Sequence, residues 1–430
     1  MTPLSLRGAL VVLVLSAGAG GRVLAEPLTL AEAHATALRN HPRVTIAQLR
    51  ELIAREVVRE NRAAYFPTAD AYADGVEAGN RNTRILAGGL NNPVIYDRVA
   101  DGIGVSELIT DFGQTSNRVA GARLEARAES QNAAAVNEQI LLSVDVHYFG
   151  ALQAQAVLRV ARDTVASRQL LVNRVEALAR NQLKSSLDVS FAQVALEESL
   201  LLQQNAEGDV AGSQASLSAA LGYRDSHSFE LADEPLPSGN PPDVDRVIDA
   251  ATRNRPDLLR LRFERDAAIR AARAQKDRNY PTLAAVGSFG NAMSHDYRLP
   301  DKYAAGAITL DIPLFEGGAF LARQHEAELN ARIADQVLRD EEDNVGRDVR
   351  LAWIALNASR QRLRTTEQLL SYAGQAYELA QARYRMGSSS MLELSEAQLS
   401  ATTARIAAAS ARYDELIRQS MLDYQTGSLR

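Results

Sequence analysis

The chain has 430 residues, a formal net charge of −6 and no cysteine. This length allows two or three domains, and the lack of cysteine excludes disulfides, thiolate metal sites and a lipid anchor on an N-terminal cysteine. The mildly acidic balance argues against nucleic acid as a partner.

The first 25 residues predict a secretory signal peptide. Arg7 precedes an apolar run over residues 8–17, and Val23-Leu24-Ala25 fits a signal-peptidase site. No later segment approaches the 18 consecutive apolar residues that indicate a transmembrane helix. We therefore expect an exported protein that is periplasmic, secreted or an outer-membrane β-barrel.

Two stretches of the chain recur at a fixed offset, which predicts two halves with one plan. Arg39-Asn40-His41-Pro42 resembles Arg253-Asn254-Arg255-Pro256, and Phe66-Pro67-Thr68 resembles Tyr280-Pro281-Thr282, each 214 positions apart. We predict a first repeat over residues 26–234, a proline-rich linker over residues 235–243 and a second repeat over residues 244–430.

Long stretches without proline predict long helices. No proline lies between Pro93 and Pro235 or after Pro313, and these stretches combine good helix formers with apolar residues at helical spacing. Each half then has one long helix and two helices of about half its length, which suggests that the two short helices stack end to end along the long one. Such hairpins must pack sideways against neighbours to bury their apolar faces. The expected helices cover residues 29–62, 114–181 and 187–221, and then 244–278, 318–386 and 391–424.

Strands are expected only between the first and second helix of each half. They cover residues 67–77 and 101–109, and then 281–289 and 306–314, with loops over residues 78–100 and 290–305. Their lengths suit strands that cross an outer membrane. Four strands cannot close a barrel, and unpaired edges cannot stay in lipid, so the chain is expected to assemble. Three copies would give 12 strands and would lay the helices side by side in a second tube.

The turns between the last two helices of each half have a common pattern. Gly387 is a helix stop, because glycine adopts the left-handed conformation at little cost. Ser390 and Glu393 then have the spacing of a capping box that starts the next helix. Ser185 and Asp188 repeat that spacing in the first half. Each stretch therefore predicts a sharp turn between two antiparallel helices.

Several short motifs, in order and in both halves, resemble the TolC family of outer-membrane factors. The resemblance covers essentially all of the mature chain. The residues that carry it are Leu28-Thr29-Leu30, Asn40-His41-Pro42, Tyr65-Phe66-Pro67, Asp111-Phe112-Gly113, Leu314-Phe315-Glu316-Gly317-Gly318, and Arg383-Tyr384 with Gly387, Ser390, Leu392 and Glu393.

This resemblance implies a mainly α-helical fold with membrane β-strands. It implies a homotrimer with a 12-stranded outer-membrane β-barrel, four strands from each chain, continuous with a long periplasmic helical barrel. Such a channel would be the exit duct of a tripartite efflux or type I secretion system and would conduct substrates passively. Its partners would be outer-membrane lipid, a periplasmic membrane-fusion adaptor and an inner-membrane pump, with no cofactor and no enzymatic activity.

The resemblance also implies roles for the two turns. Glu393 and Glu396 would face the pore near its closed end, and Tyr384 and Asp188 would join the polar links that hold that end shut. The family has glycine at the position of Gln182, so a differently shaped first turn is expected. Some members have a basic residue at the position of Ser389, so the closing links here would be weaker or would use other partners. The residues expected to contact the adaptor are Gln182, Leu183, Lys184 and Ser185 in the first turn and Gly387, Ser388, Ser389 and Ser390 in the second.

Simpler explanations remain open for these residues. Capping alone accounts for Glu393 and Asp188, and Glu396 is equally compatible with an ordinary solvated helix face. The six histidines are scattered without metal-ligand spacing. The alternative for the whole chain is a periplasmic coiled-coil adaptor or scaffold, although such proteins have one long hairpin rather than two.

Overall fold

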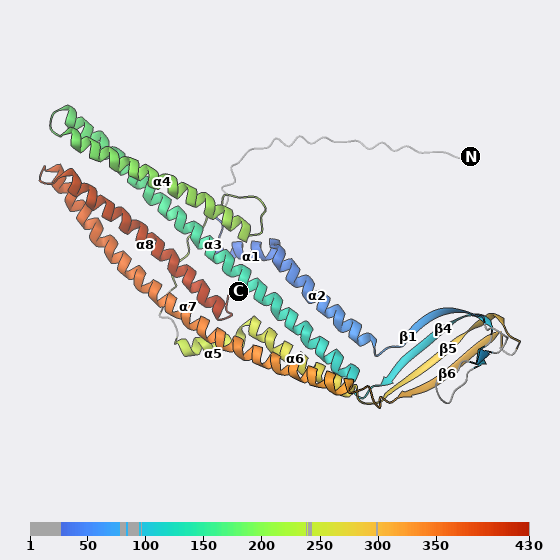
Figure 1. Cartoon of the computed structure of the whole chain (residues 1–430). Coiled ribbons are helices and arrows are strands. Elements are labelled where there is room, and N and C mark those ends of the chain that lie inside the picture. The colour runs from blue at the N-terminus through green and yellow to red at the C-terminus, as the bar shows by residue number, and fades with distance from the viewer. Residues whose placement is uncertain are drawn as a thin grey trace, which may run out of the picture.

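The computed structural model describes residues 27–77, 83–84, 94–95, 97–237, 239, 243–297 and 300–429. The predicted signal peptide lies outside these residues, as do parts of the expected loops and of the linker. A long bundle of helices forms most of the molecule, and a small curved sheet lies at one end (Figure 1). The sheet end is called proximal below, and the opposite end distal. The mainly α-helical fold with one small sheet agrees with the sequence prediction.

Four helices of the first half have the same lengths as four helices of the second half. The first half has α1 (Leu30–Asn40), α2 (Pro42–Ala63), α3 (Gln114–Arg180) and α4 (Ser186–Ala220), of 11, 22, 67 and 35 residues. The second half has α5 (Val244–Asn254), α6 (Pro256–Asp277), α7 (Ala319–Arg385) and α8 (Met391–Gln425), again of 11, 22, 67 and 35 residues. Each residue of α3 or α4 therefore has a counterpart 205 positions later in α7 or α8.

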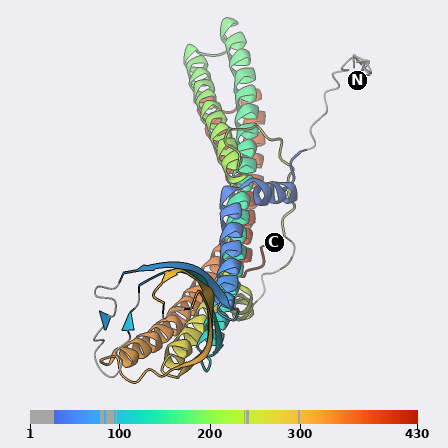
Figure 2. The ribbon, with the colours of Figure 1, turned by 90° about the vertical axis from the view of Figure 1, so that its right-hand side faces the viewer.

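The helices expected over residues 29–62 and 244–278 are not continuous, and this part of the prediction was wrong. Each breaks at the residue before a proline, at His41 and at Arg255, where the backbone is extended. A proline ring disfavours the helical conformation of the preceding residue, while the proline itself suits the first position of a new helix. After the break α2 runs along α3, whereas α1 lies across the bundle (Figure 2).

The sheet has four antiparallel strands in the order β1-β4-β5-β6. These are β1 (Thr68–Val76), β4 (Arg98–Thr110), β5 (Thr282–His295) and β6 (Lys302–Asp311). All four expected strands are present, but β4, β5 and β6 continue into the stretches expected as loops. A short ribbon of β2 (Thr83–Arg84) and β3 (Val94–Ile95) lies within the first of those loops.

The two faces of the sheet differ in polarity. On one face the ladder places Ile103 opposite Phe289, and the exposed apolar side chains there are Val99, Ile103, Val105, Phe289, Ile308 and Leu310. On the other face the Tyr72 and Tyr303 hydroxyls meet at 2.9 Å. They meet above Gly102 and Gly290, where an added Cβ would lie 2.2 Å and 2.4 Å from the Tyr303 hydroxyl. One apolar and one polar face is the pattern of a sheet between lipid and an aqueous lumen.

Halfway along the bundle the short helices meet end to end. Gly222, just after α4, packs so closely on Asn40 and His41 that an added Cβ would lie 2.9–3.0 Å from their backbone atoms. Gly427, just after α8, packs in the same way on Arg255. The buried Tyr148 of α3 brings its hydroxyl within 2.8 Å of the Leu28 carbonyl and 2.7 Å of the Ala232 carbonyl, which ties two irregular segments to this level.

The long helix α3 holds the two halves together. It packs against α2 and α4 of its own half, and against α6 proximally and α8 distally. None of the described helices is long and apolar enough to cross a membrane.

Candidate functional site

The site that the sequence singles out is the pair of turns at the distal end, between α3 and α4 and between α7 and α8 (Figure 1). In the first turn Gln182 has φ +60°, and in the second Gly387 has φ +76°. The Leu183 N–H donates to the Leu178 carbonyl at 2.9 Å, and the Ser388 N–H donates to the Arg383 carbonyl at 3.0 Å. The two bonds are equivalent, and each closes the end of a helix that stops at a residue in the left-handed conformation. The expectation that Gln182 gives the first turn a different shape was therefore wrong, because Gln182 adopts the conformation that glycine adopts in the second.

The helix starts after the two turns differ. Ser185 and Asp188 form a complete capping box, since the Asp188 N–H donates to Ser185 Oγ at 3.1 Å and the Ser185 N–H donates to the Asp188 carboxylate at 3.1 Å. Ser390 accepts from the Glu393 N–H at 3.2 Å, but the return bond from the Ser390 N–H to Glu393 is missing. The expected second capping box is thus only half formed.

The Glu393 carboxylate is used elsewhere. It pairs with Arg383 at 3.0 Å across the turn and accepts from the Ser389 hydroxyl at 2.7 Å. Arg383 also donates to the Ser388 carbonyl at 3.3 Å. Sequence reasoning missed Arg383, because its partner lies ten positions away across a turn rather than at helical spacing. The pair neutralises Glu393 within its own hairpin.

Tyr384 joins the two hairpins of the chain. Its side chain is only 5% exposed, and its hydroxyl has no hydrogen-bond partner among the described residues. The Lys184 ammonium lies 4.3 Å from the centre of its ring, which is a cation–π contact. Burial, with a further contribution from the Asp188 carboxylate, raises the pKa of the Tyr384 phenol, so the phenol stays neutral. Lys184 of the first turn is thus the basic group that contacts the Tyr384 ring, and Asp188 is held by its cap.

A single apolar core lies beneath both turns. All four distal helices contribute to it, so the two hairpins share one core rather than having one each. Its buried members are Val172 and Val175 of α3, Ala192 and Leu196 of α4, Ala380 and Tyr384 of α7, and Met391 and Leu394 of α8.

Glu396 differs from Glu393 in its surroundings. Its side chain is exposed and makes no hydrogen bond or ion pair with the described residues. Leu392 and Leu399, on the same face of α8, are also exposed. The counterpart of Glu396 in α4 is the exposed Phe191. Glu396 is therefore a free carboxylate of this end, and its role in a pore stays a prediction.

The remaining turn residues lie at the surface of the distal end. Leu183 and Met386 of the turns are 69% and 74% exposed. The Ser388 hydroxyl donates back to the Arg383 carbonyl at 3.1 Å, so it closes its own turn. Contact of any of these residues with an adaptor stays a prediction.

A polar layer separates the shared core from the rest of the bundle. The Gln398 amide donates to the Ser167 hydroxyl at 3.3 Å, which joins α8 to α3. Arg168 of α3 is buried, with its Nε and Nη1 unpaired among the described residues, and burial lowers its pKa. Sequence reasoning missed this arginine, since an arginine on a long helix is normally solvated.

Two hollows lie beside this layer. A cavity of about 140 Å³ separates the hairpins, lined on the α7–α8 side by Tyr377, Gln381, Tyr384, Arg385, Leu394 and Gln398. On the α3 side its walls are Ser167, Leu170, Leu171 and Arg174. An open groove, in two adjoining parts of about 780 and 630 Å³, runs along α3 and α4 to the first turn.

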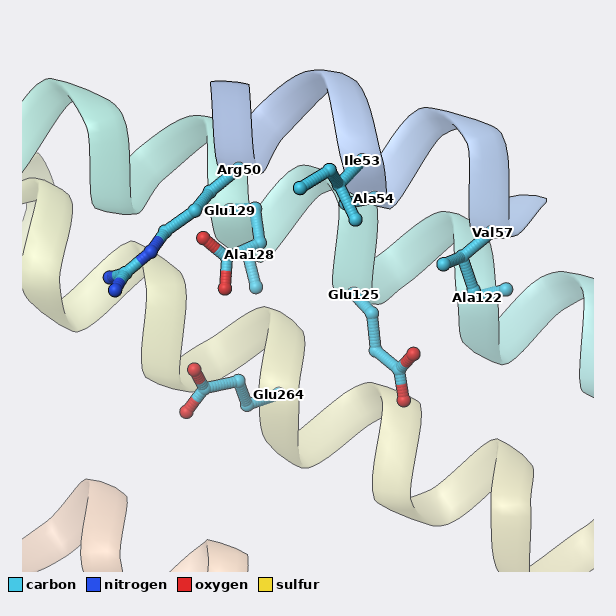
Figure 3. Close-up of a pocket in the computed structure, with 9 residues that line it drawn as sticks. All are labelled: Arg50, Ile53, Ala54, Val57, Ala122, Glu125, Ala128, Glu129 and Glu264. Atoms are coloured by element: carbon cyan, nitrogen blue, oxygen red, sulfur yellow. The ribbon is translucent and has the colours of Figure 1, made fainter. Parts of the chain in front are cut away.

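A third hollow, of about 460 Å³, lies among the proximal helices (Figure 3). Glu125 and Glu129 of α3 and Glu264 of α6 line it, opposite Arg50 of α2. Glu264 is paired with Arg260 at 2.6 Å, and no group of acidic, histidine or cysteine side chains in the described part of the chain could hold a metal ion. We assign no site there.

Comparison with known proteins agrees with this geometry. Residues 34–223 and 247–428 match the family model described as outer membrane efflux protein. The outer membrane protein TolC of Vibrio cholerae is 24% identical over 413 residues, which cover 93% of this chain and 91% of that protein. The protein CyaE of Bordetella pertussis is 28% identical over 396 residues, covering 88% and 80%.

Solved structures share the fold. The outer membrane protein VceC of Vibrio cholerae superposes with a TM-score of 0.77 at 17% identity, over 93% of this chain and 96% of that one. The open state of the MtrE outer membrane channel of Neisseria gonorrhoeae gives a TM-score of 0.74 at 21% identity, over 93% and 89%. The family match covers most of both halves. The chain therefore belongs to the outer membrane efflux protein family, the family of the TolC channels, and is an outer-membrane protein.

Proposed function

We propose that three copies of this chain form a channel that is the exit duct of a tripartite efflux or type I secretion system. Their sheets form a 12-stranded barrel in the outer membrane, and their helices form a tube that extends into the periplasm. The duct conducts substrates passively, and the energy comes from an inner-membrane pump that reaches it through a periplasmic adaptor.

One observation carries the assembly of copies. The six residues of α7 and α8 that line the cavity against α3 have counterparts 205 positions earlier, and all six line the open groove on α3 and α4. These counterparts are Val172, Glu176, Ala179, Arg180, Val189 and Gln193. The groove on α3 and α4 thus corresponds to the surface of α7 and α8 that α3 covers within the chain.

The same correspondence names what covers the groove. Ser167 and Arg174 of α3 border the cavity within the chain. Their counterparts on α7 are Tyr372 and Leu379, which are 69% and 63% exposed. Side chains of this size on a free helix face favour a partner. We assign the groove to α7 of a neighbouring copy.

The sheet supports the same arrangement. The strands β1 and β6 form the two edges of the four-stranded sheet. Since β4 pairs with β5 across the two halves, β6 of one copy corresponds to a partner for β1 of the next. Two copies would give an eight-stranded barrel, whose interior is filled by side chains. Three copies would give a barrel of 12 strands, which leaves a lumen.

At the distal end the turns are the parts of the helices farthest from the membrane. We assign Gln182, Leu183 and Lys184, with Gly387 and Ser388, to contact with the adaptor. Three copies of Glu396 would place free carboxylates at one level of the duct, where a ring of carboxylates favours cations.

The assembly is tested by extracting the protein from membranes and measuring its mass in detergent by light scattering. A channel requires detergent and has the mass of three chains, and it conducts ions in planar bilayers. A monomer that leaves the membrane in salt alone would refute the proposal and favour an adaptor. The partners are tested by cross-linking in cells that carry the Leu183→Cys variant and by identifying the protein that is joined to this cysteine. A turn that contacts no adaptor gives no cross-linked product.

The acidic ring has its own test in single-channel recordings. Glu396→Gln is expected to lower the preference for cations over anions by about 2-fold or more, since three carboxylates are removed at once. Phe191→Leu changes the corresponding uncharged position of α4 and is expected to leave the preference unaltered. Equal selectivity in both variants and in the native channel would remove Glu396 from the pore.

A further inference from the structure

We infer that the cavity between the two hairpins of the chain binds a small oxyanion of the size of phosphate. The cavity has a volume of about 140 Å³ and lies between α3 on one side and α7 and α8 on the other. All of its walls come from one chain, so this inference is separate from the proposed trimer and from the export of substrates.

The charge of the cavity wall is positive. Arg174 of α3 and Arg385 of α7 line the cavity, and neither forms an ion pair with a described residue. None of the described residues that line it is acidic. A third guanidinium is close by, because Arg168 follows Ser167 of the wall and is buried, with two nitrogen atoms unpaired among the described residues. Guanidinium groups attract oxyanions and match the spacing of their oxygen atoms.

The Tyr384 hydroxyl supplies a hydrogen-bond donor at the same place. The side chain is 5% exposed, and its hydroxyl is unpaired among the described residues. Burial raises the pKa of this phenol, so the hydroxyl keeps its proton. The acidic group that acts on Tyr384 is Asp188, which is held by its own cap, and Lys184 lies against the same ring. A buried hydroxyl without a partner costs free energy, which an acceptor in the cavity would recover.

A second free donor follows from the hydrogen bonds across the cavity. The Gln398 amide donates to the Ser167 hydroxyl at 3.3 Å, and the Gln381 amide donates to the Tyr377 hydroxyl at 3.3 Å. The Ser167 and Tyr377 hydroxyls lie 3.5 Å apart. Only one of their two protons can lie between them, so the other has no partner among the described residues. A ligand rich in acceptor oxygens matches this set of donors.

The size and place of the cavity limit the ligand further. About 140 Å³ holds several water molecules, which is room for a phosphate or sulfate ion but not for a nucleotide. The residues that line it lie on the distal parts of the helices, away from the sheet (Figure 1). The ion therefore comes from solution and not from a lipid head group next to the sheet.

The first hairpin provides an internal comparison. The counterpart of Tyr384 is Ala179, which has no hydroxyl. The counterpart of Gln381 is Glu176, which puts a carboxylate in the groove on α3 and α4. The same backbone plan thus has the donors of an anion site in the cavity and lacks them in the groove.

The site is tested by calorimetric titration of the detergent-solubilised protein with sodium phosphate, with sodium chloride keeping the ionic strength constant. Saturable binding of one phosphate per chain is expected. Tyr384→Phe removes the hydroxyl but keeps the ring that Lys184 contacts, and Arg174→Gln removes one charge. Each should weaken phosphate binding at least 5-fold, because each loses a hydrogen bond to a charged group. Arg180→Gln makes the same change of charge at the counterpart of Arg385, in the groove, and should alter binding less than 2-fold.

Hydrogen exchange of the native protein gives a second measurement that needs no variant. Phosphate should slow exchange in residues 167–174 and 377–385 and leave residues 189–201 of α4 unchanged. The inference is overturned by the absence of saturable binding, by exchange that phosphate leaves unaltered around the cavity, or by binding that either cavity variant retains at native strength. Because one chain forms the whole cavity, none of these results depends on how many copies assemble.

Discussion

The first turn offers a direct test of how this chain ends its long helix. Gln182 has φ +60°, a conformation that costs an L-residue roughly 1–2 kcal/mol. Glycine removes that cost but loses about 0.5–1 kcal/mol through its greater freedom in the unfolded chain. We expect Gln182→Gly to stabilise the turn by about 1 kcal/mol, which corresponds to roughly 5-fold slower opening-limited exchange.

Hydrogen exchange of the turn peptide measures this change locally. The Leu183 N–H, which donates to the Leu178 carbonyl at 2.9 Å, is the amide to follow. The matched control is Gly387→Gln, which places glutamine at the equivalent position of the second turn. An added Cβ there has no heavy atom within 4 Å, so any loss of protection comes from backbone conformation and not from a clash. The reasoning is refuted if Gln182→Gly leaves exchange unchanged, or if Gly387→Gln protects its own turn as well as glycine does.

Three further changes test the second turn, the end of α8 and the sheet. Arg383→Gln removes the partner of Glu393, and because both side chains are nearly half exposed it should cost less than about 1 kcal/mol of turn stability by hydrogen exchange; a larger cost would show that the pair is better shielded. Burial raises the pKa of Asp423, so the folded state favours the protonated carboxyl and loses stability as pH rises from about 4. Asp423→Asn should thus raise the melting temperature by circular dichroism at pH 7 and leave it unchanged at pH 4, and a gain of equal size at both values would count against this explanation. Gly290→Ala places a Cβ 2.1 Å from the Asp101 carbonyl oxygen and 2.4 Å from the Tyr303 hydroxyl, so it must displace the backbone of β4 as well as the ring, at a cost of about 1–3 kcal/mol; the heat resistance of the proposed trimer on gels should fall, and an unaltered resistance would mean that the sheet adapts to the added methyl group.

The sequence predicted the long elements well because their signals are local. Stretches without proline, helical spacing of apolar residues and the alternation in residues 306–314 are properties of neighbouring residues. The breaks at His41 and Arg255 had a local signal too, since each precedes a proline. They were missed because Pro42 and Pro256 are also good first residues of a helix, so the apolar pattern continues past them.

The candidate site was less predictable because its decisive contacts are not local. Glu393 was expected to cap its own helix, but Arg383 on the other side of the turn takes its carboxylate. Lys184 and Tyr384 lie 200 positions apart in the chain, and only the packing of the two hairpins brings them to 4.3 Å. The conformation of Gln182 was obscured by its residue type, because the energy that holds the turn comes from the two helices that it joins.

A duplicated chain that assembles into a ring makes each kind of joint twice, and its two versions are free to diverge. Tyr384 and Ala179 occupy corresponding positions, but only Tyr384 lies at a joint within the chain. The surface within the chain and its counterpart between copies of the proposed ring therefore share one backbone plan but not one set of side chains.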